Sequence, residues 1–394
     1  MATFRDVGLG HIRFFGTAIV GGIIDLALPA TRRRAAIPGG GAMEPFVLDP
    51  TRLPPSIDLL GAVVTEDVRA AGRKLFSKGH RLTGADLAVL PTLDRPVHAV
   101  RLAPDDVHED DAGHRLALAV AGHGLGRTVE LRGPVQSRYN LAATTKGLLR
   151  VDAERLRAIN LIEGMAVFTL PDGMVVLPGR TVTGVKITPV AVPEAALREA
   201  EAVAAGRPVA EVRPFLPRAV GVVSTEGMAD RVRQRFRETV ERKIGWFGGR
   251  VVRFEERPAE PVAVAAAIEG LIADGAEVVL AAGGNTIDPL DATLRALPAI
   301  GAEMVRFGAP AHPGSMFWLA RRGAVPIVNL ASCSMYSKAT VADLVLPPIM
   351  AGEEVGPNEM ADLGLGGLLD RGMGWRFPQY HESEDAAGDG NEEG

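Results

Sequence analysis

Apolar and polar positions follow two different patterns along this chain, and the change falls near residue 218. Beyond it, short apolar runs typical of buried strands, such as "AVGVVST" (219–225), alternate with segments of helical periodicity. Strand and helix alternate five times, which predicts a mainly parallel sheet covered by helices on both faces, a three-layer α/β/α domain over residues 218–350. In "MADRVRQRFRETVERKI" the apolar residues recur every four positions on one helix face: Met228, Val232, Phe236, Val240 and Ile244.

Two segments of this series carry specific expectations. "DPLDATLRALPAIG" (288–301) is predicted to be a helix with Asp288 as its N-cap and Pro289 at its first helical position. "GSMFWLARRG" (314–323) is predicted to be a further helix, with the apolar side of Trp318 in the core.

Residues 53–206 show short β-branched runs broken by glycine and proline, with one or two helices among them. In "GMAVFTLPDGMVVLPGRTVTGVKITPVAV" (164–192), "PDG" predicts a turn between two strands. A helix over 193–206 and the proline-flanked "RPFLP" (213–217) mark the domain boundary. The fold class is therefore α/β, with a β-rich α+β domain before the mainly parallel one and a C-terminal extension over 351–380.

Both ends of the chain look unlike a folded domain. The apolar stretch from Ala18 to Leu28 is too short to span a bilayer and contains Asp25, and its arginines follow it, whereas a signal peptide's charges come first. We expect residues 1–42 to be a disordered leader or a misassigned start. Residues 381–394, "HESEDAAGDGNEEG", are acidic and rich in small residues, and we expect them to be disordered.

Charge and motif content exclude several classes of protein. The formal net charge of the 394 residues is -5, which gives no global positive field for nucleic acid. The single cysteine, Cys333, excludes an internal disulfide framework and suits the reducing cytoplasm, where we expect the protein, with no membrane partner. The sequence lacks G-x-x-x-x-G-K-[ST], H-E-x-x-H and paired C-x-x-C motifs, which argues against a P-loop ATPase, a zincin and a zinc ribbon.

Three successive loops in the second half are rich in small residues, and each is expected to leave a strand and precede a helix. In an open parallel sheet such loops meet at the carboxyl edge, where helix N-termini and free backbone N–H groups favour anions. The pattern predicts a site for a phosphorylated small molecule, although tight turns alone could also explain the glycines. The three loops are Gly283-Gly284-Asn285-Thr286, His312-Pro313-Gly314-Ser315 and Ser332-Cys333-Ser334.

Asp288 and Asp291 complicate a simple phosphate site, because carboxylates repel an anion unless they bind a metal ion or accept hydrogen bonds from the ligand. Asp288 has a structural alternative as an N-cap, and Asp291 as an acidic residue in a first helical turn. The chemical alternative is a Mg²⁺ ion that the two carboxylates hold together with the ligand's phosphate.

A second acidic stretch lies in the first half. "DDVHEDDAGH" (105–114) contains His108 and His114, which suggests a metal site, but an acidic first helical turn explains the same residues.

Several motifs together resemble those of one family, in order and spacing from about residue 56 to 370. The chain resembles molybdopterin-binding proteins, relatives of the molybdopterin molybdenumtransferase, and within them a stand-alone subgroup without an assigned reaction. The motifs are "VHEDDAG" (107–113), "KGLLRVDAERLRAIN" (146–160), "GGNTIDPLD" (283–291), "HPGSMFWLA" (312–320), "CSMYSKATVADLVLP" (333–347), "AGEE" (351–354) and "LGLGGLL" (363–369).

The resemblance implies a pterin pocket on the second domain. It carries cofactor binding over to Gly283, Gly284, Thr286, Asp288 and Asp291, and matches Pro313, Gly314 and Ser315 to a second family loop. The loop pattern adds Asn285, Ser332 and Ser334 to the expected cofactor-binding residues, and the charge argument gives Asp288 and Asp291 the expected catalytic and metal-binding roles. Two departures concern the reaction. Ser315 stands where transferases typically have a lysine, and Ala331-Ser332-Cys333 stands where a proline–glycine pair is usual.

The implied function is molybdopterin binding in molybdenum cofactor biosynthesis or delivery, with molybdopterin or its adenylylated form as ligand and Mg²⁺ and molybdate as further candidates. As an enzyme, the protein would transfer molybdenum to molybdopterin. The alternatives are a non-catalytic carrier or chaperone for a molybdoenzyme client, and a nucleotide-dependent hydrolase on the same fold. A homodimer is expected by family analogy alone.

Overall fold

The structure is a computed structural model that describes residues 43–54, 56–284, 286–330 and 340–380. The expectations for residues 1–42 and 381–394, and those for Asn285, Ser332 and Ser334, therefore lie outside the described residues. Within the described residues, no helix combines the length and the apolar character needed to cross a membrane.

The first part of the described chain is a small β-structure with its own core. Strands β1 (Glu44–Leu48), β5 (Val97–Arg101) and β2 (Val63–Val64) form an antiparallel sheet in that order, and β3 (Val68–Ala70) pairs with β4 (Arg73–Phe76). Helix α1 (Ser56–Leu59) and the 3-10 turns η1 (Asp86–Ala88) and η2 (Leu90–Thr92) complete it. The apolar side chains of Leu48, Phe76 and Leu90 belong to one buried cluster here.

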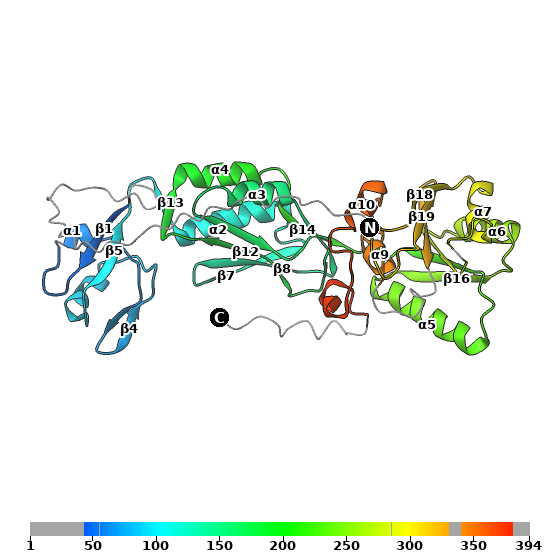
Figure 1. The fold of residues 1–394 in the computed structure, drawn as a ribbon. Coiled ribbons are helices and arrows are strands. Elements are labelled where there is room, and N and C mark those ends of the chain that lie inside the picture. The colour runs from blue at the N-terminus through cyan, green and yellow to red at the C-terminus, as the bar shows by residue number, and fades with distance from the viewer. Residues whose placement is uncertain (1–42, 55, 285, 331–339, 381–394) are drawn as a thin grey trace, which may run out of the picture. The chain divides into compact units, whose positions relative to one another are not determined.

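The middle part packs helices against a four-stranded antiparallel sheet in the order β10-β12-β8-β7. In Figure 1, α2, α3 and α4 lie together on one side of β7, β8 and β12. Its elements are β6 (Asp106–His108), α2 (Glu109–Ala121), η3 (Gly122–Gly124), β7 (Val129–Val135), β8 (Arg138–Ala143), β9 (Gly147–Val151), α3 (Ala153–Asn160), β10 (Met165–Thr169), β11 (Val175–Val176), β12 (Thr181–Ile187), β13 (Ala191–Pro193), α4 (Glu194–Ala204) and β14 (Ala210–Pro214).

The "PDG" segment at 171–173 lies between β10 and β11, but these two strands do not pair. β10 pairs with β12, whereas β11 joins a separate sheet in the order β11-β9-β14. The expected turn is present, and the strands that it joins belong to different sheets.

The last part is built on a six-stranded sheet in the order β16-β15-β17-β20-β19-β18. Strand β15 runs parallel to β16 and β17, and β17 runs parallel to β20, while β19 is antiparallel to both of its neighbours. Its elements are β15 (Ala219–Ser224), α5 (Asp230–Trp246), β16 (Arg250–Glu256), α6 (Pro261–Ala273), β17 (Val278–Ala282), α7 (Ala292–Ala299), β18 (Glu303–Phe307), β19 (Trp318–Arg322), β20 (Val325–Leu330), α9 (Ala342–Met350), α10 (Pro357–Asp362) and η4 (Arg371–Arg376).

Two apolar clusters lie on the two faces of this sheet. On one face, α5 and α9 pack against alternate strand residues such as Val222, Leu280 and Val328. On the other face, α6 and α7 pack against the intervening residues, including Val279 and Ile327. Side chains of successive strand residues point to opposite faces, so a central strand covered on both sides is apolar throughout.

The helix predicted over 314–323 is wrong, because Trp318–Arg322 form strand β19. Trp318 faces the cluster of α6 and α7 while Leu319 faces that of α5 and α9, which is the alternation of a strand buried on both faces. A short apolar run of this kind does not reveal its period in the sequence. Trp318 itself is buried in the core, as expected.

Candidate functional site

The parallel strands β15, β17 and β20 end at one edge of the sheet, with Ser224, Ala282 and Leu330 as their last residues. Ligands of open α/β sheets bind outside this carboxyl edge. Two glycines follow β17 directly, Gly283 with φ +95° and Gly284 with φ +86°, both in the region of backbone space that favours glycine.

Both glycines allow close contacts that a side chain would prevent. A Cβ on Gly283 would lie 2.6 Å from Cγ of Glu226 and 2.9 Å from Oγ1 of Thr225, in the loop after β15. A Cβ on Gly284 would lie 2.6 Å from Oδ2 of Asp291. The N–H groups of Gly283 and Gly284 have no hydrogen-bond acceptor among the described residues. The loop thus brings to the carboxyl edge two neighbouring donors that are unpaired within the described residues.

The helix after this loop begins later than predicted. Helix α7 starts at Ala292, and its N-cap is Asp291, whose Oδ1 accepts hydrogen bonds from the N–H groups of Thr293 (2.9 Å) and Leu294 (3.2 Å). The predicted N-cap role of Asp288 is therefore wrong, and its Oδ1 accepts from the Leu290 N–H (2.9 Å) in a preceding turn. Asp288 and Asp291 both have a short acceptor side chain suited to capping, and the cap at Asp291 satisfies two helix amides.

The second predicted loop also reaches this region, although it leads into β19 and not into a helix. The peptide bond between His312 and Pro313 is cis, and Gly314 has φ +109°. A Cβ on Gly314 would lie 3.0 Å from the N atom of Val341, immediately before α9. The expectation that each loop precedes a helix is wrong for this one, which instead packs against the start of a helix that comes later in the chain.

A hydrogen bond joins the two loops. The Thr286 hydroxyl donates to the Met316 carbonyl oxygen at 3.0 Å, although 30 residues separate them. Ser315 is the neighbour of Met316 and is exposed. The structure therefore brings Thr286 and Ser315 to the same edge of the sheet, while Ser332 and Ser334 lie outside the described residues.

The C-terminal extension runs beside the second loop. The His312 N–H donates to the Gly367 carbonyl at 2.8 Å, and the Leu369 N–H donates to the His312 carbonyl at 2.8 Å. "LGLGGLL" is therefore a structural partner of "HPGS", which explains why these two motifs occur in one chain.

Two buried polar side chains near this edge were not predicted. Asn329, the penultimate residue of β20, is 2% exposed and its Oδ1 has no hydrogen-bond partner among the described residues. It pairs with Ala281 in the ladder and faces the side covered by α7, as alternation from Ile327 requires. Thr293, in the first turn of α7, is equally buried, and its hydroxyl is also unpartnered within the described chain. The sequence signal was a lone asparagine within the apolar run "VPIVNL".

A hollow of about 270 Å³ opens beside the end of β15. It offers cations, carboxylates and two aromatic rings, and the Arg237 guanidinium lies 4.7 Å above the ring of Phe254. Arg233 is neutralised by ion pairs to Asp230 and Glu256. The lining residues are Ser224, Met228, Arg233, Phe236, Arg237, Phe254, Glu255 and Glu256.

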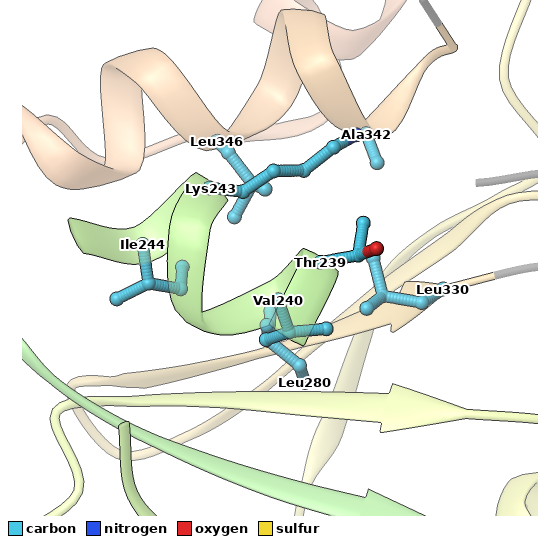
Figure 2. A pocket seen from close by; sticks show the side chains of 8 residues that line it. All are labelled: Thr239, Val240, Lys243, Ile244, Leu280, Leu330, Ala342 and Leu346. Atoms are coloured by element: carbon cyan, nitrogen blue, oxygen red, sulfur yellow. The ribbon is translucent and has the colours of Figure 1, made fainter. Parts of the chain in front are cut away.

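A second hollow lies between α5, α9 and the sheet, and Figure 2 shows the eight side chains that line it. Most of them are apolar, and the amine of Lys243 is paired with Asp343 at 2.8 Å. Asp343 is fully buried and also accepts hydrogen bonds from the Tyr380 hydroxyl (2.7 Å) and from Thr340. This hollow belongs to the core around a buried ion pair and offers no free charge to a ligand.

The carboxylates of the predicted site, Asp288 and Asp291, could hold a metal ion only together with a ligand that supplies further oxygen atoms. No group of three or more His, Cys, Asp or Glu side chains among the described residues could hold a metal ion by itself. Mg²⁺ usually takes one or two protein carboxylates and completes its shell with water and substrate phosphates. Asp288 and Asp291 fit that mode only if a phosphorylated ligand supplies the remaining oxygens.

The acidic stretch 105–114 forms a helix start. His108 is the N-cap of α2, its Nδ1 accepts from the Asp110 N–H (3.2 Å), and its Nε2 bonds the Gly79 carbonyl (2.8 Å). Glu109 is 3% exposed, and burial raises the pKa of its carboxyl. Both motif residues thus have structural partners, which favours the helix interpretation over the metal site.

Comparison with known proteins does not assign the chain to a family. No family model and no curated protein matches the chain. Among solved structures, it is similar to the molybdopterin biosynthesis MoeA protein from Pyrococcus horikosii, with 17% identity over 54% of this chain and 68% of that one and a TM-score of 0.26. It is also similar to a molybdopterin biosynthesis protein from Mycobacterium abscessus, with 18% identity over 34% of this chain and 92% of that one and a TM-score of 0.26. TM-scores this low do not establish a shared fold or function, so the family expected from the sequence stays a proposal.

Proposed function

We propose that the carboxyl edge of the six-stranded sheet binds the phosphate of a pterin of the molybdopterin type, and that the protein acts in molybdenum cofactor biosynthesis or delivery. The observation that carries this proposal is the hydrogen bond between Thr286 and Met316, because it joins two of the three predicted ligand loops at one edge. The chemical identity of the ligand comes from the sequence motifs, and the geometry supports only its anionic group.

The loop after β17 has the features that an anion requires. Gly283 and Gly284 have N–H groups that are unpaired within the described chain, and Gly284 is exposed to an approaching phosphate. The N-terminal end of α7 lies eight residues further on, and because Asp291 already caps its Thr293 and Leu294 N–H groups, it contributes only its dipole. Ser315 adds an exposed hydroxyl group from the second loop, whereas the hydroxyl of Thr286 donates to the Met316 carbonyl and holds the two loops together.

Asp288 and Asp291 fit this proposal as ligands of a Mg²⁺ ion shared with the phosphate. Such an ion would cancel the repulsion between the carboxylates and the anion, and it would supply Lewis acidity when bound. In a transferase, the same carboxylates would position molybdopterin for the uptake of molybdenum from molybdate.

A carrier without catalytic activity is the second candidate, and Ser315 favours it. A serine hydroxyl is neutral at this position, where the resembling transferases typically have a cationic lysine. A carrier would bind the finished cofactor and release it to a molybdoenzyme without inserting metal.

Isothermal titration of the full chain with molybdopterin and with its adenylylated form tests the binding proposal. We expect saturable binding with a Kd at or below about 10 μM, equivalent to roughly 7 kcal/mol, and weaker binding by a dephosphorylated pterin. Equal affinity for phosphorylated and dephosphorylated pterin would contradict a phosphate site, and no binding of either form would remove the pterin.

Molybdate incorporation separates the two candidate functions. A transferase would convert molybdopterin and molybdate to the cofactor in a Mg²⁺-dependent reaction. A carrier would bind the finished cofactor and leave molybdopterin unchanged under the same conditions.

A further inference from the structure

One flank of helix α5 carries a row of exposed arginines that form no ion pair within the described part of the chain. Arg231, Arg235 and Arg242 are exposed, and their spacing of four and seven residues places them on one side of the helix. None of the three has a carboxylate partner among the described residues, whereas Arg233 on the neighbouring side is paired twice. Glu238 is exposed on the same flank, between Arg235 and Arg242, and accepts a hydrogen bond from Gln234. The three arginines therefore outnumber the one carboxylate among them and leave the flank net cationic.

The described chain ends beside the C-terminal end of α5. The ring of Tyr380 packs edge-on against Trp246 and Phe247 at the end of α5, with centroid distances of 5.8 Å and 6.1 Å. Its hydroxyl donates to Asp343, which fixes the position of the chain at this point. Trp246 follows Arg242 by four residues and so lies on the same flank.

The residues that follow Tyr380 have the complementary charge. Residues 381–394 contain six carboxylate side chains and no lysine or arginine. Extended at about 3.3 Å per residue, these fourteen residues reach roughly 45 Å. The row from Trp246 back to Arg231 spans about 22 Å at the helical rise of 1.5 Å per residue. The segment is long enough to follow the whole row.

We propose that residues 381–394 dock along the row Arg231, Arg235 and Arg242 of the same chain. The tether at Tyr380 makes this contact intramolecular, so the effective concentration of the acidic segment is high even if each ion pair contributes little. The occupant is this segment and not a separate anionic molecule. The inference does not depend on the identity of the ligand at the carboxyl edge.

Zero-length cross-linking of the full chain tests the proposal. A carbodiimide joins carboxylates to amines, so Arg235→Lys places a reactive amine in the row while keeping its charge. Gln234→Lys is the matched control, because residue 234 is also exposed and lies about 100° around the same helix. Peptide mapping of the monomer by mass spectrometry then measures links between each introduced amine and residues 382–393.

We expect the Arg235→Lys variant to give at least about fivefold more links than Gln234→Lys, with the excess lost at 0.5 M salt, where screening removes exposed ion pairs. Adding Arg231→Gln and Arg242→Gln to the Arg235→Lys variant should reduce its links further. Equal yields of cross-links at the two positions would overturn the proposal. Cross-links found only in covalent dimers would also overturn it, because the segment would then contact another copy of the chain. Circular dichroism of each variant checks that α5 is intact.

Discussion

Gly284 lies directly against the carboxylate of Asp291, so close that a Cβ on Gly284 would be 2.6 Å from Asp291 Oδ2. Because Asp291 caps α7 and Gly284 has φ +86°, Gly284→Ala must both strain the backbone and displace the cap. We expect a loss of about 2 to 4 kcal/mol in the free energy of unfolding, as the sum of a left-handed alanine and a weakened cap. Urea denaturation measures this loss, and ligand titration should show weaker binding.

Gly275→Ala is the matched control for that experiment. Gly275 has φ +90°, but a Cβ there would meet no atom within 4 Å. Its substitution should cost only the backbone term, about 1 kcal/mol. Equal losses for the two variants would mean that the contact with Asp291 does not matter.

Asp291→Asn separates the structural role of Asp291 from a chemical one. Asparagine caps helices about as well as aspartate, so the free energy of unfolding should change by less than about 0.5 kcal/mol. The carboxylate charge is lost, and a shared Mg²⁺ ion would be held less well. We expect at least about tenfold weaker pterin binding in the presence of Mg²⁺, equivalent to about 1.4 kcal/mol, and little change without it.

Two further variants serve as controls for this experiment. Asp291→Ala removes the cap as well and should cost about 1 kcal/mol in stability. Asp288→Asn tests the second carboxylate, whose Oδ1 is engaged by the Leu290 N–H. If Asp291→Asn binds the pterin as tightly as the unchanged protein in Mg²⁺, then Asp291 is a cap and nothing more.

The periodicity of the sequence predicted the inner face of α5 well and its start less well. Phe236, Val240 and Ile244 are buried, as their spacing indicates, but Val232 is 38% exposed and Met228 precedes the helix. A repeat of four residues identifies a face. It does not show where the helix passes beyond the edge of the sheet, because that depends on the length of the strand beneath it.

The candidate site was predictable in part for a similar reason. Small residues after apolar runs indicated the loops of Thr286 and Ser315, and the structure brings those loops together. The contacts of Gly283 with Thr225 and Glu226 were not predictable, since they depend on which strand lies beside β17. Asn329 stands out in the sequence as a lone polar residue in an apolar run, but its burial could not be predicted, because it comes from the packing of α7 against the sheet.

Lys243 and Asp343 form an ion pair whose loss should be costly. The side chains are 12% and 0% exposed, and the amine and carboxylate lie 2.8 Å apart. Lys243→Met leaves the Asp343 carboxylate buried beside the Tyr380 hydroxyl, without a cation. We expect a loss of about 3 to 5 kcal/mol in the free energy of unfolding, measured by urea denaturation.

The double variant Lys243→Met/Asp343→Asn should recover part of that loss, because asparagine removes the buried charge, keeps one acceptor oxygen for Thr340 and can donate its amide N–H to the Tyr380 hydroxyl oxygen. Asp230→Asn tests an exposed ion pair for comparison, since the Asp230 side chain paired with Arg233 is 97% exposed. This substitution should lower the free energy of unfolding by less than about 1 kcal/mol. A loss of similar size for Lys243→Met and Asp230→Asn would show that burial does not strengthen the first pair.

Glu109 should make the protein less stable as the pH rises. Burial raises the pKa of its carboxyl and Asp110 adds to this, whereas His108, Ser137 and Lys186 act in the opposite direction without cancelling it. A carboxyl whose pKa is higher in the folded state binds its proton more tightly there. Its contribution to stability is therefore complete below the unfolded pKa and is lost as the pH rises through the folded value.

Glu109→Gln keeps the size and polarity of the side chain and removes this titration. We expect the variant to gain stability relative to the unchanged protein as the pH rises above the unfolded pKa of Glu109, until the carboxyl ionises in the folded state. Urea denaturation at several pH values measures it. Asp110→Asn is the control. The Asp110 side chain is 46% exposed, and its negative charge disfavours the ionised form of Glu109. Removing that charge should lower the pKa of Glu109 and weaken the pH dependence. A stability difference between Glu109→Gln and the unchanged protein that stays constant with pH would show that Glu109 is ionised throughout, and that His108 and Lys186 outweigh its burial.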